Sequence, residues 1–326
     1  MRIVVGTRGS ALALRQAREV VARLQALDPS LEVEERLVRT HGDDVRDRPL
    51  YLVGQRGAFV KRLEEALLRG EVDLAVHSLK DLPVEETKGL VLAAIPPRAD
   101  PRDALVSRSG MRLADLPPGA TVGTSSRRRA AQVRHLRPDL ALQDLRGNLD
   151  TRLRKVREGE VEAAVLAAAG LERLDLAPLA TERFDVEVLV PAPGQGALAV
   201  QVREGDEALR SLVSALDHGP TRLATQAERA FLGRVGGGCA LPVGAYAEAQ
   251  GTTLRFVAML ASVDGGTLVK GVWEGPASAW EALVARAAEE LLGAYRGRAG
   301  EPFGGTSEGG ASAHPPCGGE GKGAGG

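Results

Sequence analysis

The sequence predicts an α/β protein in which two α/β domains are followed by a smaller α+β domain. Three observations carry this prediction. The first half of the chain alternates short apolar runs with helical patterns, and the same rhythm restarts after Pro96 and Pro97. Beyond residue 209, three consecutive strand patterns are followed by a helical pattern. A β-loop-α rhythm favours mostly parallel sheets, which bind ligands at the carboxyl ends of their strands.

The first domain is predicted to alternate strands and helices along residues 1–96. Its strands are expected at 3–6, 31–38 and 72–77, and its helices at 10–27 and 58–69. Apolar residues recur at helical spacing in the first helix, and Ser10 is suited to cap its N-terminus. Pro83 ends any regular element that follows the third strand.

The second domain is predicted to span residues 97–192. Its strands are expected at 104–107, 120–123, 140–144 and 161–167, and its helices at 126–137 and 149–158. The stretch 188–204 has Pro and Gly residues between two strand patterns, which suits a return of the chain to the first domain. The first domain is therefore predicted to be discontinuous, with residues 193–208 as its second part.

The third domain is predicted at residues 209–298. A helix is expected at 221–235, three antiparallel strands at 243–248, 254–262 and 268–273, and a last helix at 278–295. The remaining residues, 299–326, contain ten Gly among the final 26 positions and few apolar side chains. Such a segment cannot bury enough surface to offset the entropy of ordering, so we expect a disordered tail with Cys317 as an inert thiol.

Composition excludes several classes of protein. The chain carries 42 Lys and Arg against 43 Asp and Glu, and 3% of its 326 residues are aromatic. These values argue against a nucleic-acid partner. Two Cys cannot form a disulfide framework, and the five His show no zinc spacing, so no metal is expected. No apolar run suits a membrane helix and the N-terminus lacks a signal-peptide pattern, so we expect a cytoplasmic protein without a membrane partner.

Two segments combine glycines with cations where strands are expected to end. The first, residues 6–10, contains Arg8 and Ser10 and leads into a helix, so it suits either an anion site or an ordinary capped turn. The second is the run 127–157, which holds nine Arg and one Lys against three Asp. Guanidinium forks bind carboxylates and phosphates in a bidentate manner, so this run favours a small polyanionic ligand. A solvated helix face suits part of the run, and a nucleic-acid interpretation is weakened by its lack of aromatic residues.

Three further features have a functional and a structural interpretation. Asp81, in the segment HSLKDLP, could stabilise a developing cation or cap a turn before Pro83. Cys239 follows three glycines, so its thiol could tether a ligand or fill a small apolar space. The segment 41–61 could be a lid over a cleft or an exposed connection.

Taken together, these segments resemble one family, porphobilinogen deaminase, also called hydroxymethylbilane synthase. The resemblance covers residues 2–297, and six motifs occur in the family's order. They read GTRGSALAL, HSLKDLP, GTSSRRR, RGNLDTRL, PAPGQGA and GGGCALPVGA. Six motifs in one order are far more specific than any one of them.

The resemblance implies a fold and a reaction. The fold is two α/β domains like those of periplasmic binding proteins, with a central cleft, and a smaller C-terminal α+β domain. The reaction is the head-to-tail condensation of four porphobilinogen molecules into hydroxymethylbilane, with loss of four ammonia. The implied cofactor is dipyrromethane, held by a thioether to Cys239. Each pyrrole unit carries an acetate and a propionate, which an Arg-rich site suits.

The resemblance also implies roles for individual residues. Asp81 matches the catalytic Asp, which would stabilise the azafulvenium-type cation left when ammonia departs. The residues implied in cofactor and substrate binding are Arg8, Ser10, Lys80, Ser126, Arg128, Arg129, Arg146, Arg152 and Arg173. Arg127 stands where relatives often have an apolar residue, so it is not assigned to substrate, and Arg56 stands where they often have Lys.

The implied partners are the substrate porphobilinogen and, for the product, uroporphyrinogen-III synthase, and the implied state is a monomer. The alternative from the residue pattern alone is a two-lobed, anion-binding solute-binding protein without catalysis. An intact mass separates the two, because only the deaminase would carry two pyrrole units on Cys239.

Overall fold

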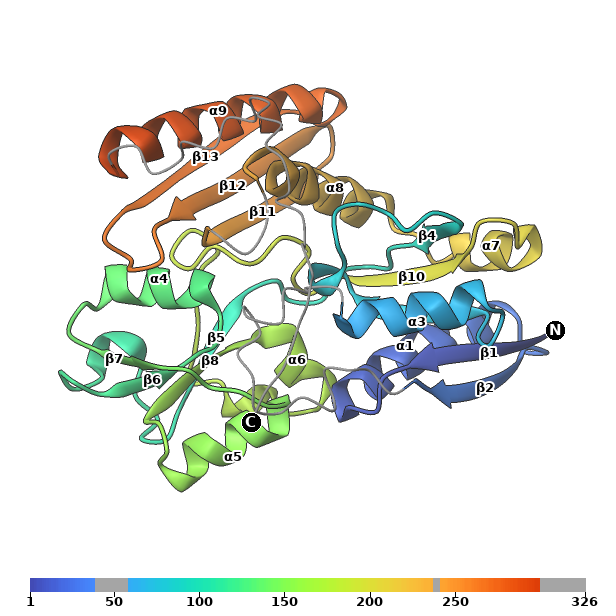
Figure 1. Cartoon of the computed structure of the whole chain (residues 1–326), viewed down its shortest axis with the longest axis horizontal. Coiled ribbons are helices and arrows are strands. Elements are labelled where there is room, and N and C mark those ends of the chain that lie inside the picture. The colour runs from blue at the N-terminus through green and yellow to red at the C-terminus, as the bar shows by residue number, and fades with distance from the viewer. Residues whose placement is uncertain (39–57, 237–240, 300–326) are drawn as a thin grey trace, which may run out of the picture.

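A computed structural model describes residues 1–38, 58–236 and 241–299 of the chain. The described residues form two five-stranded mixed sheets and one three-stranded antiparallel sheet, each covered by helices (Figure 1). We call the parts built on the two larger sheets lobe 1 and lobe 2, and the part built on the smaller sheet the C-terminal domain.

Lobe 1 has the strand order β2-β1-β3-β10-β4. Its strands are β1 (Arg2–Thr7), β2 (Glu32–Leu37), β3 (Leu74–Ser78), β4 (Leu90–Ala94) and β10 (Leu198–Arg203). Its helices are α1 (Ala11–Leu27), α3 (Ala58–Leu68) and α7 (Glu207–Ser214). β1 pairs in parallel with β2 and β3, whereas β10 is antiparallel to both β3 and β4. Apolar residues of α1 and α7 pack on one face of this sheet, and those of α3 pack on the other.

Lobe 2 repeats this arrangement with the strand order β7-β6-β8-β5-β9. Its strands are β5 (Asp103–Ser107), β6 (Thr121–Gly123), β7 (Ala141–Gln143), β8 (Ala163–Ala167) and β9 (Glu182–Arg183). Its helices are α4 (Arg127–Leu136), α5 (Leu149–Glu158) and α6 (Ala168–Arg173). β6 is parallel to β7 and β8, and β5 is antiparallel to β8 and β9. The fourth position, which β10 holds in the sheet of lobe 1, is thus held by β5 in the sheet of lobe 2.

Both sheets are mixed, so the prediction of mostly parallel sheets is wrong for two of the four strand pairs in each. The physical reason is the path of the chain between the lobes. β5 is the first strand after the chain leaves lobe 1, and β10 is the first strand after it returns, and each enters its sheet antiparallel to its neighbours. The two connecting segments lie side by side, because the amide of Ala99 donates a hydrogen bond to the carbonyl of Gly196 at 3.3 Å.

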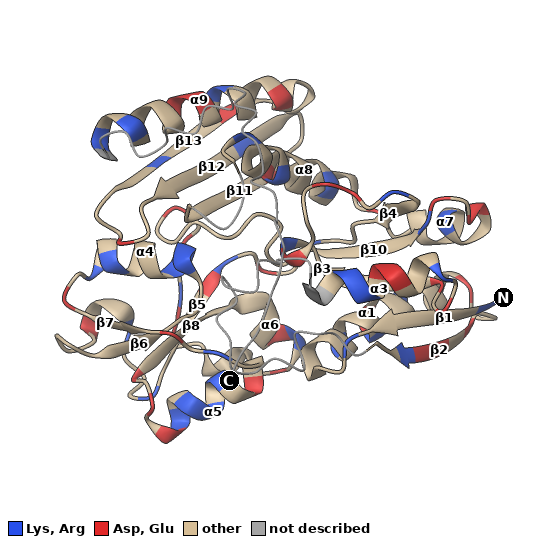
Figure 2. Cartoon of the chain, viewed as in Figure 1, with Lys and Arg blue, Asp and Glu red and all other residues tan. Residues whose placement is uncertain are grey.

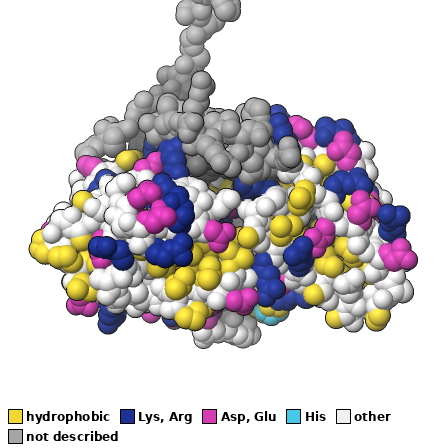
Figure 3. Space-filling view, turned by 90° about the horizontal axis from the view of Figure 1, so that it is seen from below, with side chains coloured by type: hydrophobic (Ala, Val, Ile, Leu, Met, Phe, Trp, Pro, Cys, Tyr) yellow, Lys and Arg dark blue, Asp and Glu magenta, His cyan; other side chains and the backbone are white. Residues whose placement is uncertain are grey.

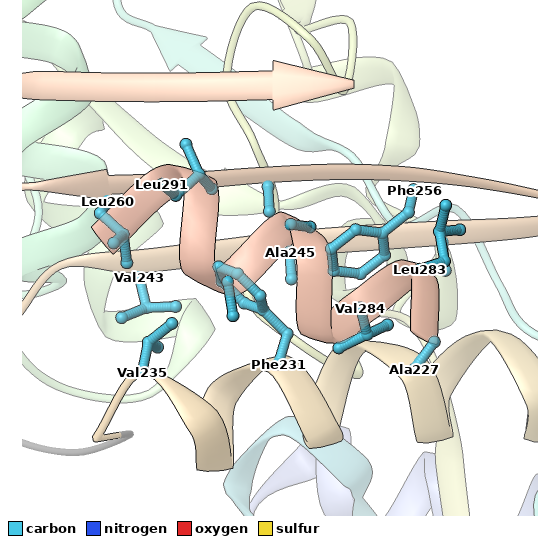
Figure 4. Close-up of a cluster of buried hydrophobic side chains, with 14 of the residues drawn as sticks. Ala227, Phe231, Val235, Val243, Ala245, Phe256, Leu260, Leu283, Val284 and Leu291 are labelled. Carbon is cyan, nitrogen blue, oxygen red and sulfur yellow. The ribbon is translucent and has the colours of Figure 1, made fainter. Parts of the chain in front are cut away.

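The C-terminal domain consists of α8 (Gly219–Arg234), β11 (Val243–Gln250), β12 (Thr253–Ala261), β13 (Leu268–Pro276) and α9 (Trp280–Ala299). The three strands form an antiparallel sheet in sequence order, as predicted. Its core lies between the sheet and the two helices, where Phe231 of α8 meets Phe256 of β12 edge to face with ring centroids 5.5 Å apart (Figure 4). The opposite face of the sheet packs on Ala131 of α4, so the domain rests directly on lobe 2.

The structure differs from the predicted elements at a few places. Residues 188–191 form turns rather than a strand. The sequence patterns missed β4, α6, β9 and α7. The predicted boundary at 208/209 falls inside α7, whose Leu209 and Val213 belong to the core of lobe 1, so this boundary was placed too early.

Some predictions concern residues outside those described. Most of the predicted lid at 41–61, the predicted attachment residue Cys239, and Cys317 with the predicted tail lie there. None of the helices in the described part of the chain is both long and apolar enough to cross a membrane. Among the same residues there is no cluster of three or more His, Cys, Asp or Glu side chains suited to a metal ion.

Candidate functional site

The residues predicted for binding lie at one kind of place in both lobes, just beyond the carboxyl ends of parallel strands. Lys80 and Asp81 follow β3 in a short 3₁₀ helix, η1 (Leu79–Asp81). Arg128 and Arg129 open α4 after β6, and Arg146 follows β7. Figure 2 shows basic residues along α4 and α5, the helices that follow β6 and β7. We call the set Lys80, Asp81, Arg128, Arg129, Arg146 and Arg152 the interlobe site.

A buried carboxylate holds two of these cations in place. Asp103 is fully buried at the start of β5, and its carboxylate accepts hydrogen bonds from Arg128 Nη1 at 2.7 Å and from Arg129 Nη2 at 2.7 Å. Burial alone would raise the pKa of Asp103, but the two guanidinium groups outweigh it and hold the pKa far below its usual range. Asp103 is therefore ionised at neutral pH, and one of the two positive charges is left uncompensated by it.

Most of the remaining donors of Arg129 are engaged as well, whereas Arg128 makes its contacts with the described residues through Nη1. Arg129 Nη1 donates to the carbonyl of Val165 at 3.0 Å, and Arg128 Nη1 donates to that of Val190. Both side chains are only 7% exposed. In this conformation Arg129 therefore acts on a ligand mainly through its charge.

Gln195 connects the two lobes at this point. Its amide nitrogen donates to Asp103 at 2.9 Å, and its amide oxygen accepts from Lys80 Nζ at 3.3 Å. The side chain belongs to the PAPGQGA segment and is buried. Gln195 therefore links the lysine of lobe 1 to the buried ion pairs of lobe 2.

Lys80 lies in a positive environment. Water can reach its side chain, yet the surrounding protein atoms displace much of the bulk solvent, and this burial lowers the pKa of its ammonium group to about 8. Arg129 lowers it further, against the opposing effects of Asp81 and Asp103. The charge of Lys80 is therefore responsive to a ligand, because an anion bound beside it would favour the protonated form.

Asp81 is the exposed carboxylate of the interlobe site. Within residues 1–38, 58–236 and 241–299, it forms no hydrogen bond or ion pair. It nevertheless favours the charged forms of both Lys80 and Arg152, so it lies near a cation from each lobe. A carboxylate in such a place stays available to a cationic group of a ligand.

Arg152 and Arg146 complete the positive side of the site. Arg152 Nε donates to the carbonyl of Gly147 at 2.9 Å, and its Nη2 lies 3.4 Å from the hydroxyl of Ser125. Burial, followed by the charge of Arg129, lowers the pKa of Arg152. Arg146 pairs with Asp144 at 2.7 Å, and its side chain is one third exposed. The guanidinium group of Arg152 keeps donors that a carboxylate could use.

Ser10 and Ser126 are N-caps, which was predicted for Ser10 and not for Ser126. The hydroxyl oxygen of Ser10 accepts from the amide of Ala13 at 3.3 Å, and that of Ser126 from the amide of Arg129 at 3.4 Å. A capping hydroxyl still has its own proton to donate, so capping and binding of an anion are compatible. Arg8 lies between the end of β1 and Ser10, at the same edge of the lobe 1 sheet as Lys80.

Arg173 connects the two lobes, and the contacts that its side chain makes are not with the other predicted cations. Its Nε donates to Glu19 of α1 at 3.0 Å, and its Nη2 donates to the carbonyl of Gly196 at 3.1 Å. The side chain is 8% exposed. The structure therefore places Arg173 at the contact between α1 and α6, and a role in ligand binding stays a prediction.

A second buried ion pair fixes all three parts of the molecule to one another. Arg98, in the segment leaving lobe 1, pairs with Glu228 of α8 at 2.6 Å and 3.1 Å. Glu228 also accepts from the amides of Gly194 and Ala247, so a fully buried carboxylate has all its contacts satisfied. The arginine lies over the ring of Tyr246, 5.2 Å from the ring centroid. Removing either charge would leave the other buried without a partner.

Sequence reasoning missed Asp103, Gln195, Arg98 and Glu228 as parts of this arrangement. Each lies in a segment that reads as a strand start, a loop or a helix face, and each has a side-chain partner at least 25 residues away. One available signal was the charge on otherwise apolar β5, whose Asp103 precedes four residues of a buried strand.

The outer surface gives a different picture. On the face seen from below in Figure 3, acidic and basic side chains are interspersed and hydrophobic side chains lie in small groups. The whole chain has a formal net charge of −1. A face of mixed charge is not the basic surface that nucleic acid requires.

Comparison with known proteins identifies relatives over most of the chain. A family model described as porphobilinogen deaminase, dipyromethane cofactor binding domain, matches residues 3–211, and one for the C-terminal domain of porphobilinogen deaminase matches residues 222–293. A porphobilinogen deaminase of Roseiflexus castenholzii is 52% identical over 292 residues, which are 90% of this chain and 96% of that protein. The porphobilinogen deaminase of Thermus thermophilus is 49% identical over 291 residues, which are 89% of this chain and 95% of that protein.

The comparison with solved structures gives matches of low similarity. The methionine-binding protein MetQ has a TM-score of 0.42 at 14% identity, covering 68% of this chain and 92% of its own. The BenM effector binding domain has a TM-score of 0.41 at 15% identity, covering 66% of this chain and 90% of its own. The fold assignment rests on the sheets described above and on the family match.

Proposed function

The chain belongs to the porphobilinogen deaminase family, and on that basis we propose that it condenses four porphobilinogen molecules head to tail into hydroxymethylbilane, with release of four ammonia. One observation carries the proposal beyond the family match. A solvent-facing carboxylate, Asp81, lies among cations contributed by both lobes. Such a site can hold a polyanionic ligand and still offer one negative charge to a cationic centre.

The donor set suits the family's dipyrromethane cofactor. Two pyrrole units bring four carboxylates, and the interlobe site offers the cations Lys80, Arg146 and Arg152. The cofactor supplies the terminal pyrrole onto which substrate units are added. We propose Cys239, outside the described residues, as its thioether attachment point, and Arg8, Ser10 and Ser126 as further hydrogen-bond donors.

Asp81 performs the central electrostatic task. Loss of ammonia from the aminomethyl group of porphobilinogen leaves a cation conjugated with the pyrrole nitrogen. The Asp81 carboxylate accepts the N–H hydrogen bond of that ring and stabilises the developing positive charge. Because the surrounding cations bind the ligand's carboxylates, they orient the ring while Asp81 acts on it.

The buried arginines have a supporting part. Arg128 and Arg129 keep a net positive charge beneath the ligand, although Asp103 and backbone carbonyls occupy most donors of Arg129 and the Nη1 group of Arg128. Arg173 holds α1 against α6, which keeps the two lobes in the arrangement that the ligand meets.

We further propose a cytoplasmic monomer that passes its product to uroporphyrinogen-III synthase. Light scattering and a coupled assay with that synthase test these two points.

Intact-mass spectrometry tests the proposal most directly. The purified protein should carry an adduct of two pyrrole units, and porphobilinogen should add further units one at a time. Cys239→Ser should carry no adduct and should be inactive. A two-lobed solute-binding protein would show no adduct in either form, and a fully active Cys239→Ser protein without adduct would refute the attachment point.

Asp81→Ala should fold but lose nearly all turnover. Removing an electrostatic stabiliser of this kind typically lowers a rate by about 10²–10³-fold. The measurement is kcat, taken together with the adduct mass and a thermal unfolding curve. Glu85→Gln is the control, because it removes an exposed carboxylate four residues further along the same segment. Normal turnover by Asp81→Ala would remove Asp81 from the mechanism.

A further inference from the structure

The loop that follows Asp81 is held by a single arginine of the C-terminal domain. Arg229 of α8 donates through Nη1 to the carbonyl of Leu82 at 3.2 Å. Its Nη2 donates to the carbonyls of Pro83 at 2.5 Å and Val84 at 3.2 Å. One guanidinium group thus engages three consecutive carbonyls, starting with the residue next to Asp81.

Packing adds a second contact between the same helix and the same loop. Gly233, one turn beyond Arg229, faces Val84, because a Cβ on this glycine would lie 3.7 Å from Val84 Cγ1. A substituted residue there would therefore meet the side chain that Arg229 helps to place. The last two turns of α8 and the residues after Asp81 form one contact surface.

The other side of Asp81 is fixed within lobe 1. The amide of Leu79 donates to the carbonyl of Ala197 at 3.0 Å. The side chains of Leu79 and Leu82 are buried in a small apolar cluster with Ile95. Within lobe 1, the chain after Leu82 runs exposed from Pro83 to Glu86. The contact that restrains it comes from α8.

The helix that supplies Arg229 is itself rigidly placed. Glu228, its neighbour, is the fully buried carboxylate that binds Arg98 and the amides of Gly194 and Ala247. The position of Arg229 is therefore set by the junction of the two lobes and the C-terminal domain. The hydrogen bonds of Arg229 and the packing of Gly233 against Val84 connect that junction to the loop after Asp81.

We propose that Arg229 is a positioning residue for the condensation, which fixes the Asp81 carboxylate by clamping residues 82–84 onto α8. This inference rests on the role of Asp81 in the proposed function. Arg229 contacts backbone carbonyls and does not enter the reaction itself. Its loss leaves the cations that bind the ligand in place but allows the carboxylate to move, so it lowers kcat more than it raises KM.

The chain provides a matched control on the same helix. Arg222 lies seven residues before Arg229, two turns away on the same face of α8. It also binds backbone carbonyls of lobe 1, those of Leu92 at 3.2 Å and Ala93 at 3.4 Å, but these belong to β4 rather than to the loop after Asp81. A general loss of contact between α8 and lobe 1 would therefore affect both variants.

The experiment compares Arg229→Gln, Arg229→Lys and Arg222→Gln in protein whose adduct has been verified by mass. Arg229→Gln should lower kcat at least about tenfold with KM changed by less than about twofold. Arg229→Lys should lower kcat less than Arg229→Gln does, because its ammonium group can still donate to a carbonyl of the loop. The recovery should be partial, because an ammonium group can reach fewer of the three carbonyls at once. Arg222→Gln should keep kcat within about twofold of the parent protein.

Hydrogen exchange supplies a readout that does not depend on turnover. The amide of Leu82, which donates to the carbonyl of Leu79 at 3.2 Å, should exchange faster in Arg229→Gln than in the parent protein or in Arg222→Gln. Unchanged kcat in Arg229→Gln, an equal loss in Arg222→Gln, or a loss of kcat without faster exchange would each overturn the proposal. If the parent protein itself has no turnover, the proposed function fails, whereas the exchange data still decide whether Arg229 clamps the loop.

Discussion

The structural roles of individual polar residues depend here on partners far away in the sequence. Asp103 reads as the first residue of a strand, yet it neutralises one of two buried guanidinium groups that lie 25 and 26 residues later. The list of cations could be predicted from motifs, because the motifs contain them. Which cations are exposed to a ligand and which are already paired could not, since that depends on contacts between the two lobes.

His77 provides a prediction at this scale. It is buried beside Gln201, and burial lowers the pKa of its imidazole from the usual 6.5 to about 4, although the hydrogen bond to Gln201 opposes the shift. Below about pH 6.5 the imidazole of His77 is protonated in the unfolded chain but stays neutral in the folded protein. The free energy of unfolding therefore falls as the pH falls from 6.5 towards 4. Between pH 7.5 and 5.5 this residue should cost about 1 kcal/mol of unfolding free energy.

Urea unfolding at the two pH values measures the effect. His77→Gln should lose less stability on acidification than the parent protein by that amount. His135→Gln is the control, because it removes an imidazole that is exposed at the end of α4. An unchanged pH dependence in His77→Gln would show that another group is responsible.

At the scale of elements, amphipathic helices and capped turns were predicted well, whereas the directions of strands were not. α1 and α5 were predicted to within one residue, because apolar spacing and the cap residue are local signals. β5 and β10 are short apolar runs, and no local signal tells on which sheet such a run lies or in which direction. The strand expected at 188–191 is absent because Pro191 and Pro193 and the residues around them turn the chain between the lobes.

The turn at Gly196 yields a prediction for the connection between the lobes. This glycine has φ +87°, and a Cβ on it would lie 2.5 Å from the carbonyl oxygen of Ala99 in the neighbouring segment. Gly196→Ala therefore combines backbone strain with a backbone clash and should lower the unfolding free energy by more than about 1 kcal/mol. Gly205→Ala, where a Cβ meets nothing within 4 Å, should change it by less than about 0.5 kcal/mol. Equal unfolding free energies for the two variants would mean that the connecting segments move apart without cost.

At the scale of the whole molecule, the two lobes bring together the charges on which the proposed function relies. Lys80 belongs to lobe 1, whereas Arg129 and Arg152 belong to lobe 2. Gln195 joins the first of these lobes to the ion pairs of the second. The sequence predicted two α/β domains and a basic site between them, but the coupling between charges appears only when both lobes are in place.

The pH dependence of substrate binding tests this coupling. Burial and the charge of Arg129 lower the pKa of Lys80 to about 8, so its ammonium group is protonated at pH 7 and largely neutral at pH 9. A neutral amine no longer attracts the carboxylates of porphobilinogen or of the growing chain. We therefore expect KM to rise between pH 7 and pH 9 by a factor of up to about ten. Lys80→Arg keeps its charge at pH 9, so its KM should stay nearly constant over this range. If the KM of Lys80→Arg rose as much as that of the parent protein, a group other than Lys80 would be titrating. The effect of Arg129 on the pKa of Lys80 would then have no influence on ligand binding.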